Sequence, residues 1–193
     1  MRIVGGKYRG RQFHPGKDFR SRPTTDFSKE SLFDILENRI NWEEAEALDL
    51  FAGTGSISFE LVSRGCRQVT AVEKDFVHCR FIRKVISELG ASNLKLIQDD
   101  VFRILARSGG AFDLVFADPP YDLPWFNQVA ERVLQSGLLK PGGLFVLEHP
   151  KAFRFNHLPG FLEMRHYGSV HFSFFVPAAL TEPDPVPVPT ESR

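Results

Sequence analysis

The fold of this chain is decided by the stretch Asp49-Leu50-Phe51-Ala52-Gly53-Thr54-Gly55-Ser56. It closes an apolar run, residues 46–51, of the length expected for a buried strand, and a helical stretch starts at about residue 56. The glycines stand at this strand-to-helix turn, where the lack of a side chain lets the backbone approach a bound molecule closely. In open α/β sheets such turns lie outside the carboxyl ends of the strands, where ligands bind.

The same alternation continues along the chain. Apolar runs at 46–51, 68–73, 94–98, 112–117 and 143–148 predict strands, and helical stretches lie between them at about 56–64, 75–89, 101–107 and 124–136. After Pro150 two alternating segments, 162–167 and 170–176, flank Gly168-Ser169 and predict a β-hairpin. Pro141-Gly142-Gly143 predicts a tight turn before the fifth strand. We expect an α/β fold whose sheet has five parallel strands and an antiparallel hairpin at one edge.

Three parts are expected along the chain. Residues 1–40 would form a basic arm, built as a small hairpin or extended segment, and a helix that runs to about Arg39. Residues 41–176 would form the α/β domain. Residues 177–193 are rich in proline and are expected to be disordered.

The formal net charge of the 193 residues is zero, but its distribution is uneven. Residues 1–22 hold seven basic side chains and one acidic one, whereas the remainder holds 17 basic and 23 acidic ones. A basic arm on an acidic body is typical of nucleic-acid binding, and the alternative is a solvated tail without a partner.

Other classes of protein are disfavoured by composition. No apolar run reaches the length of a membrane span, and the N-terminus lacks the apolar core of a signal peptide, which predicts a cytoplasmic protein. The two cysteines, Cys66 and Cys79, and the six histidines show no metal-ligand spacing, so we expect no metal.

Acidic residues at the ends of predicted strands indicate a nucleoside ligand. Glu73 ends the second strand, and a carboxylate there can accept hydrogen bonds from both hydroxyls of a ribose. The spacing also fits a nicotinamide dinucleotide, but residue 58 is Ser where that fingerprint has its third glycine, and no basic cluster awaits a pyrophosphate. An adenosyl ligand without phosphates fits better.

Two further acidic positions belong to the same edge. Asp99-Asp100 follows the third strand, and a carboxylate there can accept from the adenine amine, for which we favour Asp100. Asp49 can pair with an ammonium group of the ligand or hold the glycine loop.

The stretch Phe116-Ala117-Asp118-Pro119-Pro120-Tyr121 ends the fourth strand with hydrogen-bond acceptors and an aromatic ring. Asp118 and the Pro119 carbonyl can accept from an exocyclic –NH2 group, the two prolines restrict the backbone, and Tyr121 offers a face on which a base can stack. The alternative is an ordinary Asp-Pro turn. The pattern favours methyl transfer to the amine of a planar base.

Together with Leu139-Lys140-Pro141-Gly142-Gly143, these motifs resemble those of S-adenosylmethionine-dependent methyltransferases. Motifs near the N-terminus narrow the likeness to the RsmD family. They are Ile3-Val4-Gly5-Gly6-Lys7-Tyr8-Arg9-Gly10-Arg11, Arg22-Pro23-Thr24-Thr25-Asp26 and Glu30-x-Leu32-Phe33-x-x-Leu36. The likeness covers residues 2–176. One departure is Phe27, where the family usually has a basic residue.

The resemblance implies methylation of N2 of one guanine in 16S ribosomal RNA. It implies a Rossmann-like class I fold, with a seven-stranded, mostly parallel sheet and a small N-terminal extension. The enzyme would act as a monomer on small-subunit RNA, free or within an assembling subunit.

The residues that the motifs and the resemblance assign fall into three groups. The catalytic group is Asp118, Pro119 and Tyr121. The cofactor-binding group is Asp49, Phe51, Gly53, Thr54, Gly55, Glu73, Lys74, Asp100, Val101 and Asp118. The RNA-binding group is Arg2, Lys7, Arg9, Arg11, Arg20, Arg22 and Thr24.

Three alternatives stay open. Adenine-N6 and glutamine-amide methyltransferases use similar Asn/Asp-Pro-Pro-Tyr/Phe motifs, although the basic arm and the lack of a separate target-recognition domain favour RNA. An NAD-dependent oxidoreductase is disfavoured by the missing third glycine. A non-catalytic RNA-binding assembly factor is disfavoured by the intact Asp118–Tyr121 motif.

Overall fold

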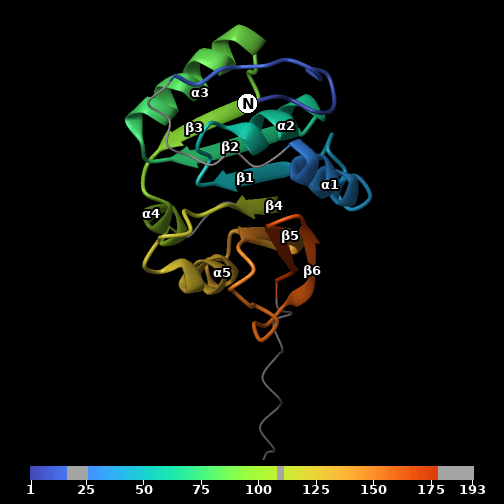
Figure 1. Ribbon diagram of the computed structural model, residues 1–193, viewed down its shortest axis with the longest axis vertical. Coiled ribbons are helices and arrows are strands. Elements are labelled where there is room, and N and C mark those ends of the chain that lie inside the picture. Colours follow the sequence, from blue (N-terminus) through green and yellow to red (C-terminus); the bar gives the residue numbers. More distant parts are fainter. Residues whose placement is uncertain (17–25, 108–110, 178–193) are drawn as a thin grey trace, which may run out of the picture.

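A computed structural model describes residues 1–16, 26–107 and 111–177. These residues form a seven-stranded sheet in the order β3-β2-β1-β4-β5-β7-β6 (Figure 1). The strands are β1 (Glu46–Leu50), β2 (Gln68–Glu73), β3 (Leu94–Gln98), β4 (Phe112–Ala117), β5 (Leu139–His149), β6 (Phe161–Tyr167) and β7 (Val170–Phe175). Strands β1 to β5 are parallel, and β7 pairs antiparallel with both β5 and β6, which confirms the predicted architecture.

Five helices within the described residues cover the two faces of the sheet. They are α1 (Asp26–Leu36), α2 (Ser56–Ser63), α3 (Phe76–Leu89), α4 (Val101–Leu105) and α5 (Phe126–Gln135). Apolar side chains of α1, α2 and α3 form one core with the sheet, and those of α4 and α5 form a second core on the opposite face. None of these helices is long and apolar enough to cross a membrane.

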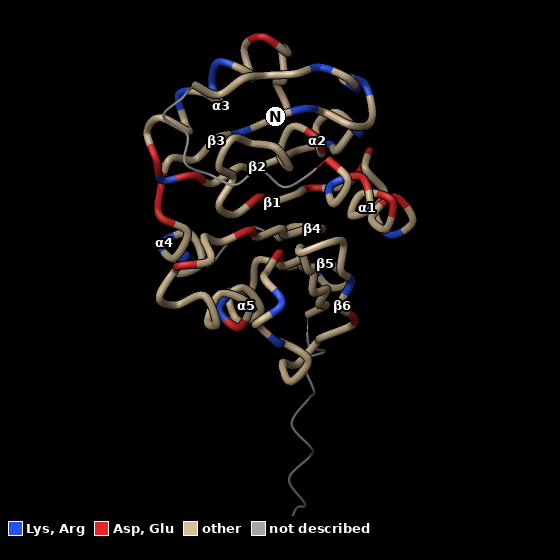
Figure 2. Tube along the Cα trace, in the orientation of Figure 1, with Lys and Arg blue, Asp and Glu red and all other residues tan. Residues whose placement is uncertain are grey.

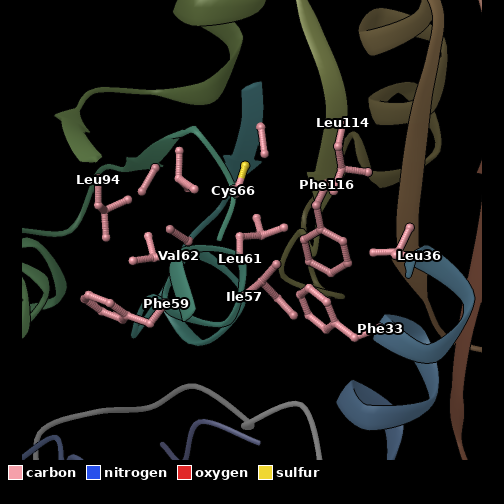
Figure 3. Packing of buried hydrophobic residues seen from close by; sticks show 14 of the residues in the cluster. Phe33, Leu36, Ile57, Phe59, Leu61, Val62, Cys66, Leu94, Leu114 and Phe116 are labelled. Carbon is pink, nitrogen blue, oxygen red and sulfur yellow. The ribbon is translucent and has the colours of Figure 1, made fainter. Parts of the chain in front are cut away.

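The first core contains aromatic and aliphatic side chains from elements that are far apart in sequence. Phe33 and Leu36 of α1 lie beside Phe116 of β4 and Ile57 of α2 (Figure 3). All four are at most 5 % exposed. Because burying each such side chain contributes about 1.5–3 kcal/mol, this contact holds α1 firmly on the sheet.

Two predicted boundaries were wrong. The first helix ends at Leu36 and not near Arg39, because the Arg39 N–H bonds to the Leu36 carbonyl three residues back (2.9 Å) and tightens the chain into a turn. The fifth strand begins at Leu139, whereas the sequence predicted that it begins at residue 143, after a tight turn. Leu139 already pairs with Phe112, and the Pro-Gly-Gly segment is accommodated as a register shift inside the strand, with Gly142 at φ +78°.

The N-terminal residues form the predicted hairpin. Arg2 and Gln12 make an antiparallel bridge, and the Ile3 N–H donates to the Arg11 carbonyl at 3.0 Å. Gly6 has φ +68°, and a Cβ atom there would lie 1.9 Å from the Ser63 carbonyl oxygen, so only glycine allows the hairpin to approach α2 this closely. The segment after it, residues 17–25, and the tail from residue 178 lie outside the described residues.

A buried carboxylate joins the hairpin to the body. Glu60 of α2 is fully buried and accepts hydrogen bonds from the Val4 N–H (2.9 Å) and the Gly5 N–H (2.7 Å). The Lys29 ammonium of α1, itself 1 % exposed, lies 3.8 Å from the same carboxylate and donates to the Arg2 carbonyl and to Ser56. Burial lowers the pKa of Lys29, and the Glu60 charge opposes that shift. One ion pair therefore connects the hairpin, α1 and α2.

We expect Glu60→Ala to destabilise the protein by about 3–5 kcal/mol, because it leaves the buried Lys29 ammonium without its counter-charge and two backbone N–H groups without their acceptor. Urea unfolding followed by circular dichroism measures the loss. The matched control is Glu88→Ala, whose partner Lys84 forms an exposed pair at 3.5 Å and whose removal should cost less than about 1 kcal/mol. Equal, small effects of the two variants would contradict the role assigned to Glu60.

Candidate active site

Four acidic side chains meet at the carboxyl end of the sheet. They are Asp49 of β1, Glu73 of β2, Asp118 directly after β4 and Glu148 of β5. Each stands two positions after a residue of the first core, and because side chains alternate along a strand, all four belong to the face covered by α1, α2 and α3. Those core residues are Ala47, Ala71, Phe116 and Val146.

A cavity of about 850 Å³ opens at this edge. It is lined by seven carboxylates, whereas Lys74 is its one lysine or arginine among the described residues. The carboxylates are those of Asp49, Glu73, Asp75, Asp100, Asp118, Asp122 and Glu148. Such a lining attracts a cationic ligand and repels a pyrophosphate. The described residues hold no cluster of three or more His, Cys, Asp or Glu side chains arranged to bind a metal.

Glu73 holds the glycine loop in place. Its Oε2 accepts from the Gly53 N–H at 2.7 Å, and its Oε1 accepts from the Asp75 N–H at 2.8 Å. The loop has an unusual backbone, since Phe51 and Gly53 have φ of +63° and +56°. Each carboxylate oxygen keeps further acceptor capacity, so Glu73 can brace the loop and still receive hydroxyl groups of a ligand.

Asp49 is buried beneath the loop. The backbone N–H of Ser58 (3.0 Å) and its hydroxyl both donate to Asp49 Oδ2. Burial raises the pKa of Asp49 to about 7, and the charge of Glu73 adds to the rise. Ser58, which interrupts the glycine fingerprint in the sequence, is thus the hydrogen-bond donor to Asp49. Through these bonds Asp49 holds the first turns of α2, directly after the glycine loop.

The two acids after β3 have different surroundings. Asp100 lines the cavity with its neighbour Val101, and its Oδ1 caps α4 by accepting from the Phe102 N–H at 2.9 Å. Asp99 does not line the cavity and pairs instead with the exposed Arg107 at 3.0 Å and Arg103 at 3.6 Å. This arrangement favours Asp100 over Asp99 as a ligand contact.

The motif after β4 forms one wall of the cavity. Burial raises the pKa of Asp118 well above the usual carboxyl value, and the charges of Glu148 and Asp49 raise it further. Pro119 is buried beside it, and both residues line the cavity. Tyr121 stands at the rim, 39 % exposed, with its hydroxyl 3.4 Å from Glu148 Oε1. A planar group that enters the cavity would meet acceptors at its edge and an aromatic ring at its face.

Sequence reasoning missed several residues of the cavity, among them Glu148 and Trp125. Glu148 is 3 % exposed and is the second-last residue of β5, so it stands near the end of an apolar run as Glu73 and Asp118 do, and the same argument could have identified it. Trp125 lines the cavity from the segment before α5 and is 53 % exposed. The sequence placed Trp125 inside the helical stretch 124–136, whereas in the structure it is the N-cap residue of α5.

The remaining predicted residues of the glycine loop differ in their placement. Gly55 is the N-cap of α2 (φ +76°), and a Cβ atom there would lie 2.7 Å from the Phe59 ring. Its contact is therefore with the helix behind the loop and not with the cavity. Thr54 and Lys74, by contrast, line the cavity.

The basic residues of the hairpin are exposed and do not line the cavity. These residues are Arg2, Lys7, Arg9 and Arg11, of which Arg2 lies 3.5 Å from Asp26. Phe27, at the position that departs from the family pattern, is 64 % exposed with its ring edge-on to Tyr167. The other predicted RNA contacts lie outside the described residues: Arg20, Arg22 and Thr24.

Comparison with known proteins places this geometry in a family. The model of the family described as conserved hypothetical protein 95 matches residues 1–176. The chain is 33 % identical over 155 residues to ribosomal RNA small subunit methyltransferase D of Haemophilus influenzae, a match that covers 78 % of this chain and 79 % of that protein.

Two further relatives agree. The Escherichia coli K12 protein of the same name is 31 % identical over 148 residues, which cover 77 % of this chain and 74 % of that one. A solved structure of a hypothetical protein from Thermus thermophilus superposes with a TM-score of 0.80 at 30 % identity, over 91 % of this chain and 98 % of that one. The chain therefore belongs to the RsmD family of ribosomal RNA methyltransferases.

Proposed function

We propose that this protein transfers a methyl group from S-adenosylmethionine to N2 of a guanine in small-subunit (16S) ribosomal RNA. The observation that carries the proposal is the Asp118-Pro119-Pro120-Tyr121 motif, which follows β4 and opens into a cavity lined by carboxylates. The names of the relatives support the RNA substrate.

The cavity lining fits the cofactor. S-adenosylmethionine carries a sulfonium and an ammonium group but no phosphate, which matches seven carboxylates and one lysine. Glu73 would accept from the ribose hydroxyls, Asp100 from the adenine amine, and the Asp49 end of the cavity would face the ammonium group. The cofactor supplies the electrophilic methyl group.

The residues after β4 would prepare the amine. The lone pair of guanine N2 is delocalised into the ring, so the amine is a poor nucleophile. Asp118 and the Pro119 carbonyl would accept its two hydrogens and hold them out of the ring plane, while Tyr121 would fix the base by stacking. The raised pKa of Asp118 suits its carboxylate to receive the proton that the amine loses.

The hairpin would hold the RNA. Figure 2 shows Lys and Arg positions along the N-terminal hairpin and Asp and Glu positions between β2 and α4. Phosphate contacts of this kind position an RNA without reading its sequence, and the target base must leave its stack to enter the cavity. A non-catalytic RNA-binding factor and an adenine-N6 or glutamine methyltransferase are the rival functions.

The decisive experiment is mapping modified nucleotides in 16S ribosomal RNA from cells with and without this protein. A guanine that carries an N2-methyl group only when the protein is present supports the proposal. Methylated adenine or protein glutamine would favour a rival enzyme, and no change would favour the non-catalytic factor.

Calorimetry should detect binding of S-adenosylmethionine and not of NAD, because the carboxylates repel a pyrophosphate. Glu73→Ala should weaken binding by about 1–3 kcal/mol, since both the loop and the ribose lose a charged acceptor. Glu88→Ala on the exposed side of α3 is the control and should bind as the wild type does. Tight NAD binding without a response to S-adenosylmethionine would refute the assignment.

Asp118→Ala should lower single-turnover methylation of 16S RNA by orders of magnitude, because the amine loses its acceptor, while the melting transition and cofactor affinity change little. Tyr121→Ala should weaken base capture by about 1–3 kcal/mol through lost stacking. A folded and fully active Asp118→Ala enzyme would remove this residue from the mechanism.

Deletion of the hairpin is not a clean test of RNA binding, because Ile3 and Phe13 belong to the core. The double variant Lys7→Ala/Arg9→Ala should instead weaken RNA binding at low salt and flatten the plot of log K against log salt by about 1–2 units of slope. Arg67→Ala/Lys140→Ala removes two cations that are already paired with Glu46 and Asp113, and it should leave the slope unchanged. Equal slopes for all three proteins would show that the hairpin does not contact phosphates.

A further inference from the structure

Glu148 is a cavity carboxylate to which the proposed function assigns no role. It is 3 % exposed, although it stands only one residue before the end of β5. Leu147 of β5 pairs in register with Ala117 of β4, so Glu148 and Asp118 come next on neighbouring parallel strands, on the same face of the sheet. The Tyr121 hydroxyl donates to Glu148 Oε1 at 3.4 Å.

The two carboxylates form a pair of acceptors. The charge of Glu148 is, after burial, the largest cause of the raised pKa of Asp118, which reflects their proximity. Burying two like charges side by side is costly, and a ligand that offers two adjacent hydrogen-bond donors relieves that cost. The pair is therefore complementary to a group with two donors next to each other.

Guanine offers such a group and adenine does not. On the Watson–Crick edge of guanine the N2 amine lies next to N1–H, so two donors stand side by side. In adenine the amine lies next to an unprotonated ring nitrogen, which is an acceptor and would face a carboxylate. Enzymes that take a base out of its stack recognise it by hydrogen bonds to this edge.

We propose that Glu148 determines the base specificity, by accepting the N1–H of guanine while Asp118 and the Pro119 carbonyl hold the N2 amine. This inference rests on the proposed function and names the residue that makes guanine the substrate. Tyr121 positions the Glu148 carboxylate through its hydroxyl while its ring faces the base. Adenine would be rejected because its unprotonated N1 would face the Glu148 carboxylate in a buried site, and both groups are acceptors. Such a mismatch discriminates strongly between bases.

The test compares guanine with 2-aminopurine, which keeps the amine at C2 but has no proton on N1. Synthetic 16S RNA fragments carry one or the other base at the nucleotide found by mapping, and single-turnover methylation is measured for each. The wild type should prefer guanine by at least about 100-fold. Equal rates on the two bases would overturn the inference without any variant.

The variant Glu148→Gln isolates the residue. Its amide can accept from N1–H of guanine or donate to the unprotonated N1 of 2-aminopurine, so the preference should narrow to about tenfold or less. Because 2-aminopurine also lacks O6, the preference for guanine in one enzyme alone does not isolate Glu148. The difference in that preference between the wild type and Glu148→Gln does. Glu131→Gln on the exposed side of α5 should keep the full preference.

Glu148→Asp is the conservative variant and should keep the preference for guanine at a lower rate. Calorimetric binding of S-adenosylmethionine should stay within about threefold of the wild type in both Glu148 variants, because the residue faces the base. A wild type that methylates no RNA overturns the proposed function and this inference together. An active wild type whose preference survives in Glu148→Gln overturns this inference alone.

Discussion

The arrangement of the whole N-terminal half depends on one buried ion pair, between Glu60 of α2 and Lys29 of α1. A buried charge is tolerated only when it is paired and hydrogen-bonded, and Glu60 meets this condition by binding the backbone of Val4 and Gly5 as well. The hairpin is therefore part of the folded body. Its arginines and lysines are held in fixed positions relative to the cavity, which is a better arrangement for positioning a large RNA than a free basic tail would be.

A second constraint shapes the site itself. Parallel strands place their carboxyl ends along a single edge, and alternation sends Asp49, Glu73, Asp118 and Glu148 to the same face. The resulting concentration of negative charge is unfavourable for the empty protein, as the raised pKa values of Asp49 and Asp118 indicate. A cationic cofactor and a base edge rich in donors would both reduce this unfavourable charge. Cofactor binding and base recognition would thus depend on the same concentration of negative charge.

Much of the site could be predicted because its residues lie next to local signals. Glycines at a turn mark the loop that contains Gly53, and an acid at the end of an apolar run marks Glu73 or Asp118. The sequence did not show which residues hold the acidic side chains of the site in place. Ser58 was noticed only as a missing glycine, yet it donates to Asp49. Glu148 has the same local signal as Glu73, but its place beside Asp118 depends on the strand order, which sets β5 next to β4 and is not written in the strand itself.

The sequence by itself determined which strands and helices follow one another along the chain, which turns need glycine, and which family the chain belongs to. Each of these follows from periodicity or from short motifs in the chain. Only the tertiary structure decided which distant residues meet. It buried Lys29 against Glu60, it placed the hairpin on α2, and it set Glu148 beside Asp118. The physical reason is that the stability of a buried charge and the pKa of a carboxylate depend on neighbours brought together by folding, and those neighbours are separated by tens of residues along the chain.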